Sequence, residues 1–209
     1  AQGEFLAFLD ADDKVDATYY SKAIEALTQY DNVQFAGCWV KYFHSSERLW
    51  PAFTPEPPII LCHNTINSSS LVYKRNAFLQ FGRNDTTMIF QGLEDYDSVI
   101  SLLANGCNGV VLPEFLFHYR VRNDSMIRDI SKTKKLLLHQ HVIDKHKEFY
   151  ASFAAEVFGL LNANGPGIVL DNPSLDYHLA EKIPLAGSLS RKLVYLVKSN
   201  QVTRKMAYK

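Results

Sequence analysis

The chain has 209 residues, of which 47% are hydrophobic and 12% aromatic, so it can bury the core of a folded domain. Basic and acidic residues number 22 each, and this balance argues against nucleic acid or any other highly charged partner. Three cysteines without a C-x-x-C pair argue against a disulfide framework, and no apolar run is long enough to span a bilayer. These features indicate a cytoplasmic protein whose electrostatic function is local.

The first 30 residues predict a strand followed by a helix. Residues 5–9 (FLAFL) are apolar and run into acids, which is typical of a buried strand with carboxylates at its C-terminal end. Residues 16–30 have apolar side chains at helical spacing, with Asp16 as a candidate cap. The expected buried positions of this helix are Tyr19, Ile24 and Leu27.

The middle of the chain continues this alternation. A β-rich segment at 33–43 is followed by a proline-rich loop at 48–60, which cannot belong to a central strand. Residues 68–74 predict a strand that leads into a short helix. Residues 93–106 have an amphipathic helical pattern, and Gly106 suits the position just after the helix.

The second half is more helical. Residues 108–122 give two short strands around Pro113, because proline interrupts a strand. Residues 131–161 predict one long helix or two in series. A loop rich in glycine, proline and asparagine and then a basic helix at 189–209 end the chain.

The order of these elements predicts the fold class. Strands that alternate with helices are typical of an α/β domain. We expect residues 1–130 to form this domain and residues 131–209 to form a helical C-terminal extension.

Four carboxylates crowd the turn after the first strand: Asp10, Asp12, Asp13 and Asp16. Acids at a strand end usually hold a hard divalent cation, Mg²⁺ or Mn²⁺, which relieves their repulsion and also binds phosphate oxygens. The alternative is a solvated turn whose acids favour the start of the next helix. An EF-hand is excluded because Lys14 stands where an oxygen ligand is required. A phosphatase of the haloacid dehalogenase type, with Asp10 as nucleophile, stays open as the runner-up.

A second pair of carboxylates, Glu94 and Asp95, begins the predicted helix after Gly92. Acids at this place can cap the helix, or one of them can act as the general base for an attacking hydroxyl. A glycosyltransferase that uses a nucleotide-sugar needs a D-x-D motif and then such a base. Both motifs occur here in that order, which favours a transferase.

With these motifs the chain resembles family 2 glycosyltransferases, which have the GT-A fold. The resemblance implies part of a GT-A domain, with a mixed sheet. The stretch "GEFLAFLDADD" is similar to that family's strand and D-x-D motif, and "SSSLVYKRNAF" to the strand and helix beside the acceptor. "GLEDYD" is similar to its base motif, and "LFHYRVRNDSM" to the Y-R stretch after the base helix. The resemblance covers residues 3–125. The family's nucleotide-binding elements precede the D-x-D, where this chain has nine residues, so we expect the chain to begin within a catalytic domain.

The resemblance implies roles for the two carboxylate motifs. Asp12 would ligate Mn²⁺ or Mg²⁺, and Asp10 would support the metal or the donor ribose. Asp95 would be the general base, on the side of the anomeric carbon opposite the leaving group, so the configuration inverts. Glu94 would orient the acceptor.

Further residues would contact the donor or the acceptor. Arg120 and Arg122 would bind the donor diphosphate, with Arg122 where many relatives carry a histidine. Trp50 would stack on an acceptor sugar, while Asn67 and Ser69 would hydrogen-bond to it. The alternatives are a loop that packs on the core around Trp50 and ordinary strand-entry chemistry at the serines.

Two other features have structural and functional interpretations. The spacing of His139, His141 and His146 does not put all three on one helix face, which argues against a zinc site. The basic segment 191–209 would pack on the core or lie on an anionic membrane surface, at the inner face of the membrane.

The predicted function is that of a bacterial, inverting, metal-dependent glycosyltransferase. It would move a sugar from a nucleotide-sugar donor to a glycan or lipid-linked acceptor in polysaccharide or cell-wall synthesis. Two rivals stay open: a non-catalytic acceptor-binding or scaffold piece, and the phosphatase.

Overall fold

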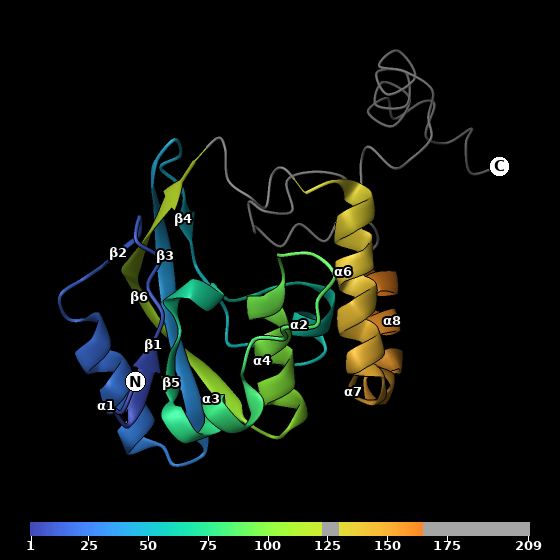
Figure 1. The fold of residues 1–209 in the computed structure, drawn as a ribbon, viewed down its shortest axis with the longest axis horizontal. Coiled ribbons are helices and arrows are strands. Elements are labelled where there is room, and N and C mark those ends of the chain that lie inside the picture. The colour runs from blue at the N-terminus through green and yellow to red at the C-terminus, as the bar shows by residue number, and fades with distance from the viewer. Residues whose placement is uncertain (123–129, 165–209) are drawn as a thin grey trace. The chain divides into compact units, whose positions relative to one another are not determined.

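The computed structural model describes residues 1–122 and 130–164, all within one compact unit, Ala1–Asn172 (Figure 1). The described strands are β1 (Phe5–Ala7), β2 (Lys14–Val15), β3 (Val33–His44), β4 (Leu49–Trp50), β5 (Val72–Lys74) and β6 (Asn108–Val121). The described helices are α1 (Tyr19–Gln29), α2 (Ile59–Cys62), η1 (Ser68–Ser70), α3 (Arg75–Phe81), α4 (Glu94–Ala104), α6 (Lys132–Lys145), α7 (Lys147–Ser152) and α8 (Ala154–Asn164).

The strands form one mixed sheet in the order β1-β5-β3-β6-β2, with β4 paired to β3. The long strands β3 and β6 are parallel, and the other pairs are antiparallel. Because β1 and β3 are both antiparallel to β5, the strands β1, β3 and β6 run in the same direction. The segments that follow these three strands therefore emerge at the same edge of the sheet.

Helices cover both faces of the sheet (Figure 1). On one face, α1 packs through Tyr19 against Val40 and its neighbours in β3. On the opposite face, α3 and α4 pack around Phe35, with Val99 of α4 in the same cluster. Successive side chains of a strand point to opposite faces, so Val40 of β3 packs in the cluster under α1 and Phe35 of β3 packs in the cluster under α3 and α4.

A third cluster joins α4 to the helices that follow β6. Tyr96 and Ile100 of α4 pack with Ile60 of α2 and Val142 of α6. The Tyr96 hydroxyl donates to the carbonyl of Ile60 at 2.6 Å and lies 3.3 Å from the hydroxyl of Tyr150 in α7. Helix α4 thus lies between the sheet and helices α6–α8.

The prediction of two short strands around Pro113 is wrong, because β6 runs through this proline as one strand. Cys38 pairs with Leu112 and Trp39 with Phe115, so Pro113 and Glu114 are left out of the ladder and are exposed. A bulge of this kind accommodates a residue that cannot donate a backbone hydrogen bond.

The predicted helix at 16–30 is confirmed, but its cap and its buried face differ from the prediction. Asp16 accepts hydrogen bonds from the amide (3.0 Å) and the hydroxyl (2.8 Å) of Thr18, two residues ahead in the turn, and does not itself cap α1. Ile24 is 36% exposed. The buried residues of α1 are Tyr19, Ala23 and Leu27. These are four residues apart and so lie on one face.

The segment 131–161 contains three helices rather than one or two. The breaks fall at His146 and Phe153, where α6 and α7 end. His146 contacts Asp97 of α4, and Phe153 packs in the third cluster. Tertiary packing against α4 therefore decides where the helical segment is interrupted, and helical periodicity does not report it.

The first strand is confirmed but is shorter and less buried than predicted. β1 has one neighbour, β5, among the described strands, and Phe8 and Leu9 beyond it are 53% and 45% exposed. No helix in the described ranges is long and apolar enough to cross a bilayer. The basic segment 191–209 lies outside the described residues, and the predicted boundary after residue 130 stays a prediction.

Candidate active site

The predicted site residues come from segments that converge on one edge of the sheet. Asp10–Asp13, called the acid loop below, follows β1. Arg120 is the second-last residue of β6, which runs in the same direction as β1, and Arg122 directly follows β6. Ligands of open α/β sheets bind beyond the carboxyl ends of the strands. Asn67–Ser70 precede β5, which is antiparallel to β1, so this segment enters the sheet at the same edge.

Helix α4 brings the second motif to this edge as well. It has 11 residues, about 16 Å at 1.5 Å per residue, and its C-terminal end leads directly into the start of β6. Its first turn, with Glu94 and Asp95, therefore points toward the end where β6 finishes.

The acid loop combines exposed and buried carboxylates. Asp10 is exposed and Asp12 partly exposed, whereas Asp13 is 9% exposed. One oxygen of Asp13, Oδ1, accepts the backbone N–H of Arg120 at 2.7 Å, while Oδ2 has no hydrogen-bond partner among the described residues. Burial, aided by repulsion from Asp10 and Asp12, raises the pKa of Asp13 to about 6.

This loop fits a divalent cation bound largely by substrate. Within residues 1–122 and 130–164, no group of three or more histidine, cysteine or acidic side chains is arranged to hold a metal. Mg²⁺-type sites commonly use one or two carboxylates and take the remaining oxygens from phosphate and water. Asp10 and Asp12 supply such a pair, and the unpartnered oxygen of Asp13 marks local negative charge that the fold leaves uncompensated.

Two arginines stand beside the acid loop. The Nη1 atom of Arg122 lies 3.7 Å from Oδ2 of Asp12, with half of the Arg122 side chain exposed. The Nε atom of Arg120 is buried without a hydrogen-bond partner among the described residues. Guanidinium groups so placed next to acids are suited to contact a diphosphate held at the same edge.

The Glu94–Asp95 pair sits on a turn with unusual backbone angles. Gly92 has a φ of 118° and Leu93 a φ of 69°, so both residues before α4 are in the positive-φ region that favours glycine. Glu94 Oε2 accepts the amide of Gly92 at 2.6 Å and so closes this turn. Glu94 is therefore engaged in holding the turn, and its predicted acceptor role stays a prediction.

Asp95, the second residue of α4, is exposed. Its Oδ1 accepts the amide of Tyr96 at 2.7 Å. Desolvation by surrounding protein raises the pKa of Asp95, repulsion from Glu94 adds to the shift, and the hydrogen bond from the Tyr96 amide opposes it. A carboxylate that solvent reaches, with a pKa moved toward neutrality, has the properties of a general base.

Tyr73 connects the two motifs. It pairs with Leu6 of β1, and its ring lies 6.2 Å from that of Phe8. Burial raises the pKa of Tyr73, and the charge of Asp95 adds to the shift. Phe8 is only two residues before Asp10. Tyr73 of β5 therefore lies near both the segment that leads into the acid loop and the first turn of α4.

The predicted acceptor residues lie in different environments. Asn67 is 8% exposed, and its Oδ1 caps η1 by accepting the amide of Ser69 at 3.0 Å. Trp50 is 7% exposed and belongs to the core cluster under α1, whereas Phe53 nearby is 61% exposed. Of these aromatic side chains, Phe53 offers a face to solvent, and the acceptor roles stay predictions.

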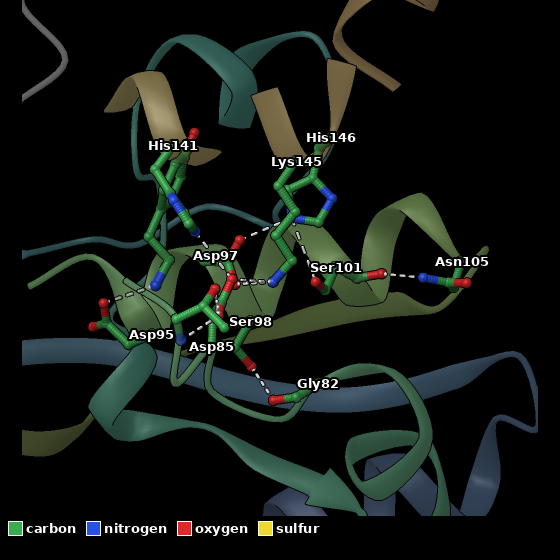
Figure 2. A network of polar contacts seen from close by, with 12 residues as sticks. Gly82, Asp85, Asp95, Asp97, Ser98, Ser101, Asn105, His141, Lys145 and His146 are labelled. Atoms are coloured by element: carbon green, nitrogen blue, oxygen red, sulfur yellow. Dashed lines mark hydrogen bonds and ion pairs between the residues drawn. The ribbon is translucent and has the colours of Figure 1, made fainter. Parts of the chain in front are cut away.

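A second group of charged residues lies behind α4 (Figure 2) and includes His141 and His146, which the sequence raised only as candidate zinc ligands. Asp97 is fully buried, and its two oxygens contact Lys145 (2.6 Å) and His146 (2.8 Å). Asp85 contacts the same Lys145 and also His141, both at 3.1 Å. We call these five residues the α4–α6 network. Its sequence signals are the histidines at 141 and 146 and a third acid in the first turn of α4, two residues after Asp95.

Comparison with known proteins supports a glycosyltransferase fold. No family model matches the chain. An uncharacterized glycosyltransferase of Methanocaldococcus jannaschii is 26% identical over 143 residues, which is 64% of this chain and 48% of the relative. The chain therefore spans about half the length of the curated relative that it matches.

Solved structures agree with this in fold. The crystal structure of S. aureus TarS in complex with UDP-GlcNAc covers 81% of this chain and 53% of its own, with 15% identity and a TM-score of 0.50. The mannosyltransferase PcManGT from Pyrobaculum calidifontis, in complex with GDP-Man and Mn²⁺, is 15% identical and covers 99% of this chain and 59% of its own, with a TM-score of 0.42. The predicted fold class, a mixed α/β sheet of the GT-A type followed by helices, is confirmed, and the chain is similar in sequence and in fold to glycosyltransferases.

Proposed function

We propose that the chain carries the metal-binding and acceptor-side part of an inverting family 2 glycosyltransferase. Such an enzyme would move a sugar from a nucleotide-sugar donor to a glycan or lipid-linked acceptor in polysaccharide or cell-wall synthesis. The observation that carries the proposal is the convergence of the acid loop, Arg120–Arg122 and Asp95 on one sheet edge. The glycosyltransferase relatives support the same class of reaction.

Asp10 and Asp12 would hold Mn²⁺ or Mg²⁺. A cation bound there would offset the charge of the diphosphate and stabilise the leaving nucleoside diphosphate. Arg120 and Arg122 would donate hydrogen bonds to the diphosphate oxygens, because guanidinium groups match phosphate geometry. Asp13 would hold the loop in place through its bond to the Arg120 amide.

Asp95 would take the proton of the acceptor hydroxyl. As the hydroxyl oxygen bonds to the anomeric carbon, its proton passes to the Asp95 carboxylate. The bond between the anomeric carbon and the diphosphate oxygen breaks, and the leaving group keeps the electron pair. The raised pKa of Asp95 suits this role, since a base is most effective when its pKa approaches the working pH.

The proposal is tested by calorimetric titration of UDP, GDP, UDP-GlcNAc and GDP-Man, with and without Mn²⁺, into this chain and into the longest natural chain that contains it. We expect metal-dependent binding in the longer chain, weakened at least tenfold by Asp12→Asn. Asp31→Asn, which changes an exposed acid outside the site, serves as the matched control.

The outcomes separate the rivals. Absence of nucleotide binding in both chains contradicts the donor assignment. Phosphate release from sugar phosphates, with a phosphoryl group found on Asp10, would support the phosphatase instead. If Asp95 is the general base, Asp95→Asn should lower the turnover of the longer chain by about 10²- to 10⁴-fold. If the longer chain binds nucleotide but shows no turnover, with or without Asp95→Asn, the result would favour the acceptor-binding or scaffold piece.

A further inference from the structure

The buried Asp97 is the centre of the α4–α6 network. A fully buried carboxylate is expensive unless positive or hydrogen-bonding groups surround it. Here each oxygen has its own partner, Lys145 at 2.6 Å on Oδ2 and His146 at 2.8 Å on Oδ1. Ser101 Oγ lies 3.4 Å from the same His146 nitrogen, one turn further along α4. Two contacts in different directions define both the position and the rotation of the carboxylate.

Both partners come from the last turn of α6. Lys145 is the final residue of α6 and His146 its C-cap. A helix end carries partial negative charge, so a cation there is stabilised by the helix as well as by Asp97. Desolvation lowers the pKa of Lys145, but its contacts with Asp97 and Asp85 outweigh this and raise it, so the ammonium stays charged.

The network also fixes the loop that precedes the motif. Asp85 Oδ2 lies 3.1 Å from both Lys145 and His141, and its Oδ1 accepts the amide (2.8 Å) and hydroxyl (2.6 Å) of Thr87. Further along, a side chain at Gly92 would come within 2.8 Å of Ile130, just before α6. Segment 85–93 is therefore held against the α6 region at both of its ends.

The geometry of α4 relates this network to Asp95. Two residues along a helix correspond to a rotation of about 200°, so Asp95 and Asp97 point to nearly opposite sides of α4. Figure 2 shows Asp97 directed toward Lys145 and His146, with Asp95 apart from them. The contacts that fix Asp97 therefore also set the direction in which Asp95 points.

We infer that Asp97, Lys145 and His146 are positioning residues that orient the proposed base Asp95 by fixing the rotation of α4 against α6. The inference rests on the proposed function for the role of Asp95. The end of helix α6 then contributes to catalysis by orienting Asp95, although none of its residues in the network touches the substrate.

The test uses the longest natural chain that contains this sequence. Lys145→Met and His146→Gln remove the contacts one at a time, Lys145→Arg keeps the charge, and Lys147→Met alters an exposed lysine two residues from Lys145. Hydrogen exchange is followed at the amides of residues 94–97 and of β3. Nucleotide release is measured with UDP-GlcNAc and GDP-Man in the presence of Mn²⁺, and UDP and GDP binding by calorimetry.

We expect Lys145→Met and His146→Gln to speed exchange at residues 94–97 at least tenfold while β3 stays protected. Turnover should fall about 10- to 100-fold, since small displacements of a catalytic group have effects of this size, with nucleotide affinity changed less than twofold. Lys145→Arg should recover most of the turnover, and Lys147→Met should match the wild type.

Unchanged exchange at residues 94–97 overturns the inference whatever the activity. Faster exchange with unchanged turnover also overturns it, because the network would then be merely structural. If the wild type binds nucleotide but no variant loses turnover relative to Lys147→Met, the inference fails and the proposed function stands. If the wild type neither binds nor turns over any donor, the proposed function fails, and with it the role of base that the inference assigns to Asp95.

Discussion

Two clusters of carboxylates, the acid loop and the α4–α6 network, differ in how the fold treats their charge. In the acid loop, three acids lie within four residues, the Nη1 atom of Arg122 is 3.7 Å from Oδ2 of Asp12, and one buried oxygen of Asp13 has no partner among the described residues. In the network, each oxygen of Asp97 is matched by a group of α6 at 2.8 Å or less. Acids without a partner can bind an external cation, whereas acids paired with basic groups fix the packing of the elements that carry them.

The largest expected effect is the loss of the compensated acid. Asp97→Ala should lower the free energy of unfolding by about 3 to 5 kcal/mol, since removing one partner of a buried ion pair leaves the other uncompensated. Asp144→Ala, at an exposed aspartate of α6, should change it by less than about 0.5 kcal/mol. Urea denaturation measures both, and equal effects would show that the network contributes no more than a surface contact.

The turn before α4 should be the next most sensitive position. Gly92→Ala places a side chain at a φ of 118° and within 2.8 Å of Ile130, so we expect a loss of about 2 to 3 kcal/mol. Gly106→Ala has a φ of 75° and open space around it, and should cost about 1 kcal/mol. Thermal unfolding compares the two variants. A larger loss at Gly106 would argue against tight packing between this turn and Ile130.

The acid loop should respond in the opposite direction. Burial raises the pKa of Asp13 to about 6 in the folded state, so ionisation opposes folding above that pH. In metal-free buffer at pH 8, Asp13→Asn should stabilise the protein by about 1 to 3 kcal/mol. The gain should shrink as the pH falls from about 6 and vanish below about pH 3, where the residue is protonated in both the folded and the unfolded state. Asp31→Asn is the exposed control, and a Asp13→Asn variant less stable than wild type at pH 8 would contradict the charge argument.

The smallest effect concerns Asp85. Hydrogen bonds from Thr87, His141 and Lys145 hold the pKa of its carboxyl below the usual range, so its contribution is present above the ordinary aspartate pKa and is lost as the pH falls. Wild type should exceed Asp85→Asn by about 1 kcal/mol at pH 6, and this difference should shrink below about pH 4. Chemical denaturation at pH 6, 4 and 3 checks it. A difference that grows in acid would contradict the sign.

The sequence by itself determined the α/β class, the helix at 16–30, the strand at 33–43 and the turn glycine Gly106, because each has a local period or a local backbone requirement. It also identified the acid loop and the Glu94–Asp95 pair from residue types at a strand end and a helix start. The convergence of these motifs followed from strand directions, which residue patterns do not encode.

Only the tertiary structure decided the role of charge within each cluster. Nothing local distinguishes Asp97 from Asp95, yet one is fully buried between Lys145 and His146 and the other is exposed. The interruption of the C-terminal helices at His146 and the bulge that carries Pro113 through β6 have the same origin. Each depends on groups more than forty residues away in sequence or on a neighbouring strand, and such contacts form only when the chain has packed.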